Sequence, residues 1–233
     1  MNPKRLASKI LDRLANNLPA RWRLPVRYYA WAVSGQMEPE LVYLFRLCSR
    51  FGCAVDVGAN HGYFSYKMVQ RFGAVYAYEA NPAVDFDIRH YRKPNLYFAP
   101  LGLSDKNATA QLRVPVQNGV PYTGWASIER RELAFAESYQ EIPVEIRRLD
   151  DEPWVQQIQV DLIKIDVEGH ELEVLTGAKN TIERDRPVLI IENNEEQSTA
   201  IRQLLEDLGY EQQDIAQFAG RPMASPNRIY TAR

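Results

Sequence analysis

Two clusters of charged residues and glycines in this chain have the spacing of a ligand site, and the first extends from residue 56 to residue 79. The segment Asp56-Val-Gly-Ala-Asn-His-Gly62 follows an apolar strand, and Glu79 ends the next strand. Gly58 and Gly62 allow the backbone to turn sharply and to approach a ligand where a Cβ atom would collide. An acid at the end of the next strand can accept hydrogen bonds from both hydroxyls of a ribose. The first cluster therefore predicts a ribose-containing cofactor.

The charge of this loop narrows the kind of cofactor. Asp56 precedes the first glycine, and the spacing of Gly58 and Gly62 is not Gly-x-Gly-x-x-Gly, so the pyrophosphate of a dinucleotide fits poorly. An anion at the strand end suits an ammonium or sulfonium group, and S-adenosylmethionine carries both together with a ribose for Glu79. The alternative is a tight turn after a buried strand, with Asp56 capping the following helix.

The second cluster, Asp161-Leu-Ile-Lys-Ile-Asp-Val-Glu-Gly-His-Glu171, also contains an apolar strand. That strand ends at Asp166, and Glu168, His170 and Glu171 lie in the turn that leads into a helix. A carboxylate here can take the proton of an acceptor hydroxyl or help to position the cofactor, and a neutral histidine can share that work. We predict Asp166 as the base, with Glu168 and His170 as alternatives. For Glu171 we favour the simpler role of an acid in the first turn of a helix.

A divalent metal ion is an alternative ligand of these strand ends. Asp166, Glu168, Glu192 and Asn193 all follow strands, and their oxygen atoms suit magnesium or calcium. Sequence spacing does not establish that the four side chains converge. A divalent metal is therefore possible in this sequence but is not expected.

The elements that position the two clusters alternate between strands and helices. Beyond Glu79 the hydrophobic pattern predicts strands at 96–99, 161–166 and 187–192, helices at 171–184 and 198–208, and a return strand from Tyr210. Such alternation predicts an α/β fold, with helices on both faces of a mainly parallel sheet and ligands at the carboxyl ends of its strands.

Residues 114–154 interrupt this alternation. The segment contains several prolines and glycines, then a stretch at 129–141 that we expect to be helical, then a strand at 144–149. Long insertions near the carboxyl ends of strands often form lids and acceptor pockets. Tyr122, Trp125 and Ser127 are therefore candidate acceptor-binding residues. In the alternative interpretation, Trp125 only anchors an ordered loop to the core.

Residues 1–49 form a basic extension ahead of the sheet. Up to Arg27 its basic side chains are set against the single acid Asp12, and Leu6, Ile10 and Leu14 have helical spacing. We expect a helix that packs on the core with its basic face in water. Peripheral contact with an anionic membrane is the alternative.

Composition and net charge limit the classes of function that remain open. A chain of 233 residues can bury a substantial core, and its net charge of -2 gives no reason to expect nucleic acid as a partner. No segment approaches the roughly 20 apolar residues that cross a bilayer, and no apolar signal-peptide core follows the basic start. We expect a cytoplasmic protein in which Cys48 and Cys53 are buried free thiols.

Two motifs of the chain are more restrictive than the glycine loop. They are Lys164-Ile-Asp-Val-Glu-Gly169 and Leu172-Glu-Val-Leu-Thr-Gly-Ala178, which follows it. Together with segments 55–65, 75–82, 101–105 and 148–151, these motifs make residues 50–195 resemble the FkbM family of S-adenosylmethionine-dependent methyltransferases. The glycine loop alone indicates only a class I methyltransferase.

The resemblance implies a Rossmann-like, doubly wound, seven-stranded sheet with an antiparallel last strand in residues 50–233. It also implies methyl transfer, usually to a hydroxyl of a sugar, glycan or secondary metabolite, with Asp166 and Glu168 facing the methyl group. The implied cofactor-binding residues are Asp56, Gly58, Asn60 and Gly62 at the methionine part, Glu79 at the ribose, Asn81 in the same motif, and Ser104 and Asp105 at the adenine edge. His61, His170 and Ala80 depart from the family pattern.

Two other functions stay open at this point. A catalytically silent cofactor-binding or scaffold protein would keep the same fold, because fold does not fix function. A nicotinamide-dependent oxidoreductase is disfavoured by Asp56 and by the glycine spacing.

Overall fold

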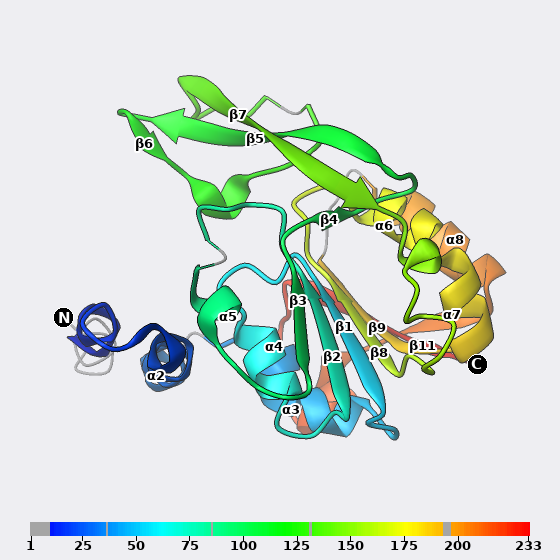
Figure 1. Cartoon of the computed structure of the whole chain (residues 1–233). Helices are drawn as coiled ribbons and strands as arrows, with labels where there is room; N and C mark the ends of the chain where they lie inside the picture. The colour runs from blue at the N-terminus through cyan, green and yellow to red at the C-terminus, as the bar shows by residue number, and fades with distance from the viewer. Residues whose placement is uncertain (1–9, 36, 85, 131, 193–196) are drawn as a thin grey trace.

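The computed structural model describes residues 10–35, 37–84, 86–130, 132–192 and 197–233. In this part of the chain the main sheet has the strand order β10-β11-β9-β8-β1-β2-β3 (Figure 1). Its strands are β1 (Cys53–Val57), β2 (Ala74–Tyr78), β3 (Leu96–Ala99), β8 (Leu162–Ile165), β9 (Val188–Glu192), β10 (Tyr210–Gln213) and β11 (Asn227–Ala232). The last strand, β11, is antiparallel to both of its neighbours, whereas β3, β2, β1, β8 and β9 pair in parallel. The predicted seven-stranded α/β sheet is therefore confirmed.

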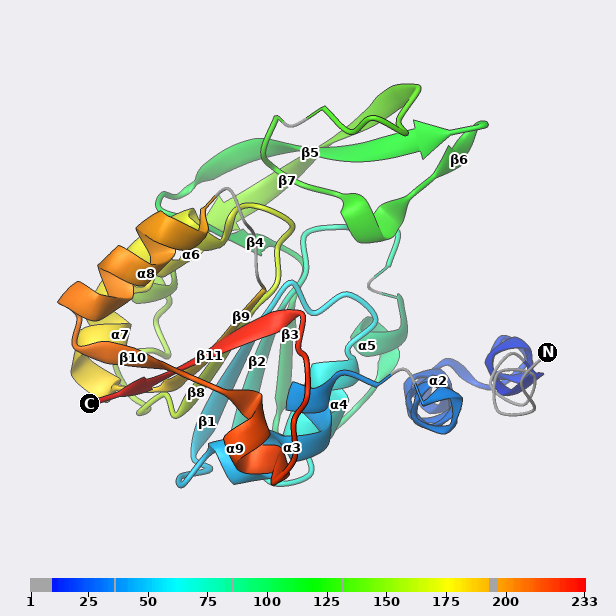
Figure 2. The same cartoon turned by 180° about the vertical axis from the view of Figure 1, so that it is seen from behind.

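Helices cover both faces of this sheet because its strands are apolar on both sides (Figures 1 and 2). Ala54 and Val75 face one core and Val55 and Val57 face the other, as the alternation of side chains along a strand requires. The first core is covered by α2 (Ala20–Ser34), α3 (Pro39–Leu47), α4 (Tyr63–Met68), α5 (Phe86–His90) and α9 (Ile215–Ala219). The second is covered by α6 (Glu171–Gly177), α7 (Lys179–Asp185) and α8 (Ser198–Asp207).

The helix predicted at 171–184 is divided into α6 and α7. Ala178 leaves helical geometry at φ -108° and ψ 4°, between the two helices. A Cβ atom at Gly177 would lie 1.9 Å from the carbonyl oxygen of Ser104, so α6 ends in close backbone contact with that loop. The short helix η2 (Leu149–Asp151) then supports α7, because Asp150 accepts hydrogen bonds from the backbone of Asn180 and from both the backbone and the hydroxyl of Thr181.

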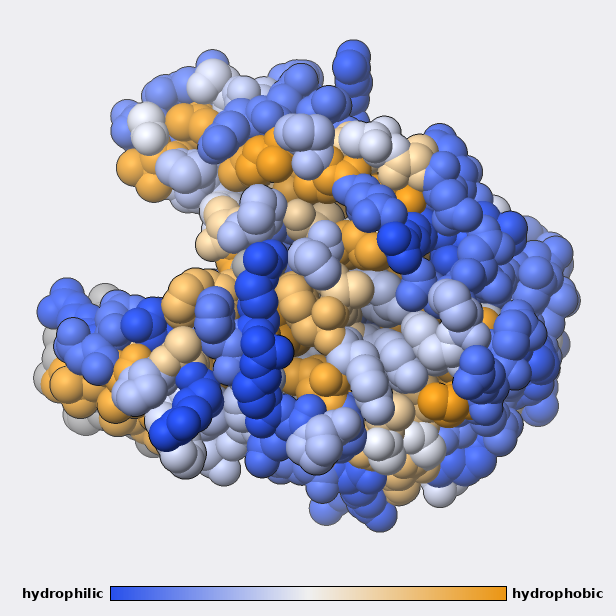
Figure 3. All heavy atoms as spheres, viewed as in Figure 1, coloured by the Kyte–Doolittle hydropathy of each residue, from blue (hydrophilic) through white to orange (hydrophobic). Residues whose placement is uncertain are grey.

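A second, four-stranded sheet lies above the carboxyl ends of the main strands (Figure 1) and begins at Gly102, ahead of the predicted insertion at 114–154. In the space-filling view, a hollow separates the lobe of this sheet from the lobe of α2 (Figure 3). The second sheet consists of β4 (Gly102–Leu103), β5 (Ala108–Gln117), β6 (Val120–Pro121) and β7 (Ser138–Arg147), with the short helix η1 (Thr123–Trp125) after β6. The strands β5 and β7 pair in antiparallel register from Ala108 opposite Ile146 to Val116 opposite Ser138. We call this β5–β7 unit the hairpin.

The helix predicted at 129–141 is wrong. Among its described residues, 138–141 belong to β7 and the others form no helix. The glutamates and alanines of this stretch have high helix propensity, but tertiary packing overrides it. Leu112, Val114, Val144 and Ile146 form a small apolar core on one side of the hairpin, and only a strand presents Val144 and Ile146 to the same face.

The basic extension contacts the first core. Residues 10–15 are helical, and residues 1–9, which include Leu6, lie outside the described part of the chain. Tyr28 of α2 packs on Tyr66 with a distance of 4.6 Å between ring centroids, and Arg27 forms an ion pair with the buried Asp87 at 2.8 Å. No helix among the described residues is both long and apolar enough to cross a membrane.

The cysteine prediction is confirmed. Cys48 and Cys53 are buried free thiols, and burial raises the pKa of each to about 12. Neither thiol is therefore reactive at neutral pH.

Candidate active site

The glycine loop after β1 packs directly on the turn after β8. Gly58 has φ +72°, and a Cβ atom there would lie 1.8 Å from the carbonyl oxygen of Asp166. The amides of Gly58 and Ala59 both donate to the carbonyl oxygen of Tyr78, at 3.0 and 2.9 Å. Gly62 has φ +90° at the start of α4, against the side chain of Ile88. The loop thus keeps the ends of β1, β2 and β8 together.

Glu79 holds the same loop from the end of β2. Its buried carboxylate accepts a hydrogen bond from the amide of Asn60 and one from the amide of Asn81, both at 2.7 Å. Asn60 adopts the left-handed conformation, with φ 52°. These two bonds fix the orientation of the carboxylate at the end of β2.

A buried lysine, which we did not include among the predicted site residues, lies at the centre of the site. The Lys164 ammonium is 3.1 Å from Asp166 Oδ2, 3.8 Å from Asp56 Oδ1 and 3.1 Å from the carbonyl oxygen of Gly58. Burial lowers the pKa of Lys164, but the charges of Asp166, Asp56 and Glu38 outweigh it and raise that pKa above its ordinary value. Lys164 is therefore a permanent cation among these acids.

Asp56 lines neither cavity of the site. Its carboxylate is fully buried and accepts a hydrogen bond from the hydroxyl of Ser65 at 2.6 Å. Burial raises its pKa, against the opposing effect of Lys164. Asp56 thus lies beside Lys164, which does line the larger cavity.

The larger cavity at the site has a volume of about 230 Å³ and lies between the glycine loop and the basic extension. Trp31 and Glu38 of the extension line it, opposite Asp166 and Lys164. The other lining residues are 58–61, Tyr63 and Phe64. Trp31 stacks on Tyr63 with 5.0 Å between ring centroids. Burial lowers the pKa of His61 in this wall, so its ring is neutral at pH 7.

A smaller, mainly apolar cavity of about 50 Å³ lies under the hairpin. Glu79 and His170 line it together with Ala126 and Ile128 of the insertion. The remaining lining residues are Val57, Gly58, Tyr78, Ala80, Gly102, Leu103, Leu112 and Val167. The insertion therefore covers the side of the site where Glu79 lies.

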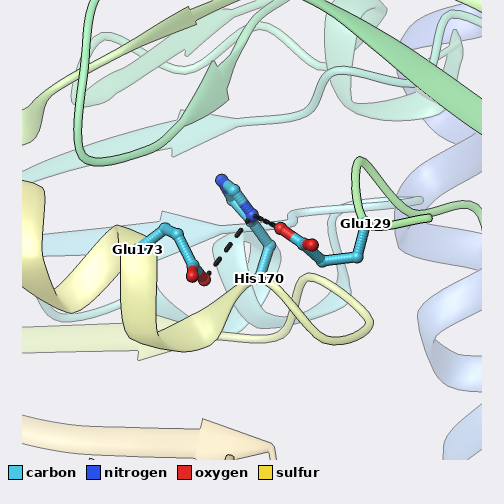
Figure 4. A group of neighbouring side chains, drawn as sticks. All are labelled: Glu129, His170 and Glu173. Carbon is cyan, nitrogen blue, oxygen red and sulfur yellow. Dashed lines mark hydrogen bonds and ion pairs between the residues drawn. The ribbon is translucent and has the colours of Figure 1, made fainter. Parts of the chain in front are cut away.

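Two contacts attach the hairpin to the second cluster. The buried hydroxyl of Ser127 donates to the carbonyl oxygen of Glu168 at 2.7 Å. Glu129 Oε1 lies 2.6 Å from Nδ1 of His170 (Figure 4). Nε2 of His170 lies 2.9 Å from the hydroxyl oxygen of Ser104. Both ring nitrogens of His170 therefore have partners at the hairpin side of the site.

A group of acids converges at the ends of β8 and β9. Carboxylate oxygens of Asp166, Glu168 and Glu192 lie within 4.8 Å of one another. Asn193, the fourth residue named in the metal hypothesis, lies outside the described residues. Burial, with the charges of Asp166, Glu168 and Glu171, raises the pKa of Glu192 to about 8. Glu192 is therefore mostly protonated at neutral pH.

The other predicted residues lie in the insertion or beside Glu79 and His170. Tyr122 and Trp125 are exposed, pack against Phe135, and line neither of the two cavities. Asn81 and Ser104 are buried beside Glu79 and His170, and the hydroxyl of Ser104 donates to Asp105 Oδ1 at 3.1 Å.

The residues that sequence reasoning missed are Trp31, Glu38, Lys164 and Glu129. Lys164 carried a signal, because a lone lysine inside an apolar strand must find a buried counter-charge. The other three lie far from both clusters in sequence.

The sheet order, the glycine loop after β1 and the acid at the end of β2 together define the class I methyltransferase fold. The family model described as "Methyltransferase FkbM domain" matches residues 56–211, and the chain belongs to this family. A search of curated proteins finds no match.

Solved structures with related folds are distant in sequence. Methyltransferase FkbM from Methylobacillus flagellatus is 17% identical, with a TM-score of 0.50 over 97% of this chain and 58% of that chain. This chain thus spans less than two thirds of that protein. Precorrin 8w decarboxylase from Methanobacterium thermoautotrophicum is 17% identical, with a TM-score of 0.46 over 84% of this chain and 89% of that one. A Streptococcus mutans methyltransferase in complex with SAH is 12% identical, with a TM-score of 0.43 over 83% and 96%.

Membership of this family identifies S-adenosylmethionine as the cofactor, and the residues of the site fit it. The buried carboxylate of Glu79 lines the smaller, mainly apolar cavity, and an acid beside apolar walls suits a ribose that carries an adenine ring. The close approach at Gly58, where a Cβ atom would meet backbone, explains why this loop has glycine. The carboxylates around Lys164 favour a ligand with positive charge.

Proposed function

We propose that this protein methylates a hydroxyl group of a sugar, glycan or secondary metabolite. The observation that supports this proposal best is the larger cavity, in which Asp166 faces the same space as the stacked rings of Trp31 and Tyr63. Aromatic faces with a few converging polar groups suit a ring that carries hydroxyls. Glu38 and the neutral His61 supply further hydrogen-bonding groups in the same wall.

When bound, S-adenosylmethionine would supply an activated methyl group on its sulfonium sulfur, and transfer of that group to the acceptor oxygen with cleavage of the carbon–sulfur bond would leave S-adenosylhomocysteine. Asp166 is the proposed proton acceptor for the hydroxyl. Lys164 holds Oδ2 of Asp166 at 3.1 Å, which fixes the orientation of the carboxylate and leaves Oδ1 for the hydroxyl. The aromatic wall excludes water and aligns the acceptor, and such positioning supplies up to about 7–11 kcal/mol in favourable cases.

The first test is cofactor binding, measured by calorimetry with S-adenosylmethionine and S-adenosylhomocysteine. We expect micromolar binding, weakened at least tenfold in Glu79→Ala, because that variant loses the ribose acceptor and the two hydrogen bonds that hold Asn60 and Asn81. Glu183→Gln on the exposed surface of α7 is the control. Binding of NADH instead of the sulfur compounds would support an oxidoreductase.

The second test is methyl transfer from radiolabelled cofactor to a panel of sugars, glycans and hydroxylated metabolites. Asp166→Asn should bind the cofactor within about tenfold of wild type but lose about 10²- to 10⁴-fold in turnover, the usual contribution of a general base. A fully active variant would remove Asp166 from the catalytic role. Cofactor binding without transfer to any acceptor would favour the silent scaffold.

A further inference from the structure

We propose that Glu129, His170 and Glu173 form a binding site for one divalent transition metal ion, such as zinc, that fastens the hairpin to the core. The three side chains come from two parts of the fold, the insertion and the start of α6, and point toward one another (Figure 4). Glu129 follows η1 in the insertion, His170 precedes α6, and Glu173 lies in the first turn of α6.

The candidate ligand atoms of this group converge on one point. Two ligands of a tetrahedral zinc ion lie about 3.3 Å apart, so the Glu129 carboxylate has to move away from Nδ1 of His170 by about 0.7 Å when zinc binds. Nδ1 of His170 lies 2.6 Å from Glu129 Oε1 and 3.6 Å from Glu173 Oε2, and the three candidate ligand atoms lie within 4.8 Å of one another. One imidazole nitrogen and two carboxylates are three of the four ligands of a tetrahedral zinc ion. His170 is buried, but the side chains of Glu129 and Glu173 are 41% and 31% exposed, so a water molecule can complete the coordination.

The contacts of His170 place Nδ1 toward both carboxylates and Nε2 toward Ser104. Nδ1 lies 2.6 Å from Glu129 Oε1 and 3.6 Å from Glu173 Oε2, and Nε2 lies 2.9 Å from the hydroxyl oxygen of Ser104. In the tautomer whose hydrogen is at Nε2, the ring donates to Ser104 and the Nδ1 lone pair faces the two carboxylates, which is the arrangement that binds a metal. In the other tautomer Nδ1 donates to Glu129, and zinc would replace that hydrogen.

The same hydrogen bonds form the outer support that metal-binding histidines usually have. A histidine that binds a metal through one nitrogen typically donates the other N–H to an oxygen, which fixes the ring orientation. Ser104 and Asp105 supply that support here, and Gln197 donates to Glu173 Oε2 at 3.4 Å. The nitrogen ligand favours zinc or a similar metal over magnesium and calcium, which prefer oxygen alone.

A bound metal would restrict the opening of the hairpin at segment 126–129. Ala126 and Ile128, which cover the smaller cavity, lie within three residues of Glu129 in the chain. A metal bond at Glu129 adds to the hydrogen bond of Ser127 with Glu168, so the segment 126–129 would open less often. This consequence is measurable as slower amide hydrogen exchange in that segment when zinc is present.

The test is zinc titration of chelator-treated, dialysed, tag-free protein by calorimetry. We expect one zinc ion per chain with micromolar or tighter affinity, weakened at least tenfold in Glu129→Gln and in Glu173→Gln. Glu132→Gln is the matched control, because that side chain lies in the same segment but is 79% exposed, and its affinity should equal that of wild type. Cobalt substituted for zinc should give visible absorption bands of a four-coordinate site, which Glu173→Gln reduces.

Three results would overturn the proposal. The first is the absence of saturable zinc binding to wild type. The second is unchanged affinity in both glutamine variants. The third is loss of binding in Glu192→Gln, which would locate the ion in the cluster of Asp166, Glu168 and Glu192. Circular dichroism checks that each variant is folded, and the two glutamates are exposed enough to be replaced without disrupting a core.

Discussion

Replacing Lys164 by methionine should lower the free energy of unfolding at pH 7 by about 3–5 kcal/mol, the usual effect of removing one partner from a buried ion pair. The ammonium is almost inaccessible to solvent, lies 3.1 Å from Asp166 and 3.8 Å from Asp56, and donates to the carbonyl oxygen of Gly58. Methionine has a similar shape but no charge, so the loss reflects uncompensated carboxylates. In a chain of this size the melting temperature should fall by about 6–20 °C.

The assay is urea unfolding, followed by circular dichroism, of wild type, Lys164→Met and two further variants. Lys106→Met, at a side chain that is 68% exposed, should change the free energy of unfolding by less than about 0.5 kcal/mol. Adding Asp56→Asn to Lys164→Met should restore at least half of the loss, because asparagine still accepts the hydrogen bond of Ser65 without a charge.

The raised pKa of Lys164 also predicts how the stability difference depends on pH. The native-state pKa of Lys164 is raised above its ordinary value of 10.5, so its stabilising contribution is complete below pH 10.5 and disappears only as the pH rises through the native-state value. The difference between wild type and Lys164→Met should therefore persist at pH 9. A loss below 1 kcal/mol at pH 7, or no recovery in the double variant, would refute a charge role for Lys164.

Two further predictions concern the same edge of the sheet. Gly58→Ala should abolish measurable cofactor binding and destabilise the fold by at least about 2 kcal/mol, because its Cβ atom would meet the backbone of Asp166 at positive φ; Gly124→Ala, with open space around it, is the silent control in calorimetry and unfolding. Glu192 has a pKa of about 8 in the native state against an ordinary value of 4.5, so the native state binds its proton more tightly. The free energy of unfolding should therefore fall as the pH rises from about 4.5 to 8, and urea titrations of Glu192→Gln should show a smaller fall; an identical pH profile would contradict the raised pKa.

The parts of the fold that local sequence patterns determine were predictable. The strands at 96–99 and 187–192 and the helix at 198–208 were expected within one or two residues of β3, β9 and α8, because each has a hydrophobic run bounded by turn residues. The hairpin was missed because the composition of 129–141 favours a helix. The alternation of apolar and polar residues around Val144 and Ile146 does indicate a strand. Its partner strand, β5, lies about thirty residues earlier in the chain, so no local pattern predicts the pairing.

Contacts between distant segments explain what the sequence could not reveal about the site. Local motifs located Glu79 and Asp166 at strand ends, and the structure has both there. No local pattern connects Trp31 and Glu38 to these motifs, because the chain returns to them only through the packing of α2 and α3 on the first core. Similarly, the local motif suggests His170 only as an alternative to Asp166 as the base, and it gives no indication that the ring nitrogens contact Ser104 and Glu129.

The acids around Lys164 outnumber this single cation. Asp56, Asp166 and Glu38 all act on Lys164, so a single ammonium neutralises only part of their charge. Burial raises the pKa of the neighbouring Glu192, and the charges of Asp166, Glu168 and Glu171 add to that effect, so Glu192 keeps its proton. S-adenosylmethionine brings a sulfonium and an ammonium, which relieve the same repulsion. We therefore expect these acids to favour S-adenosylmethionine over S-adenosylhomocysteine, which lacks the sulfonium charge, and calorimetry with both compounds measures this preference.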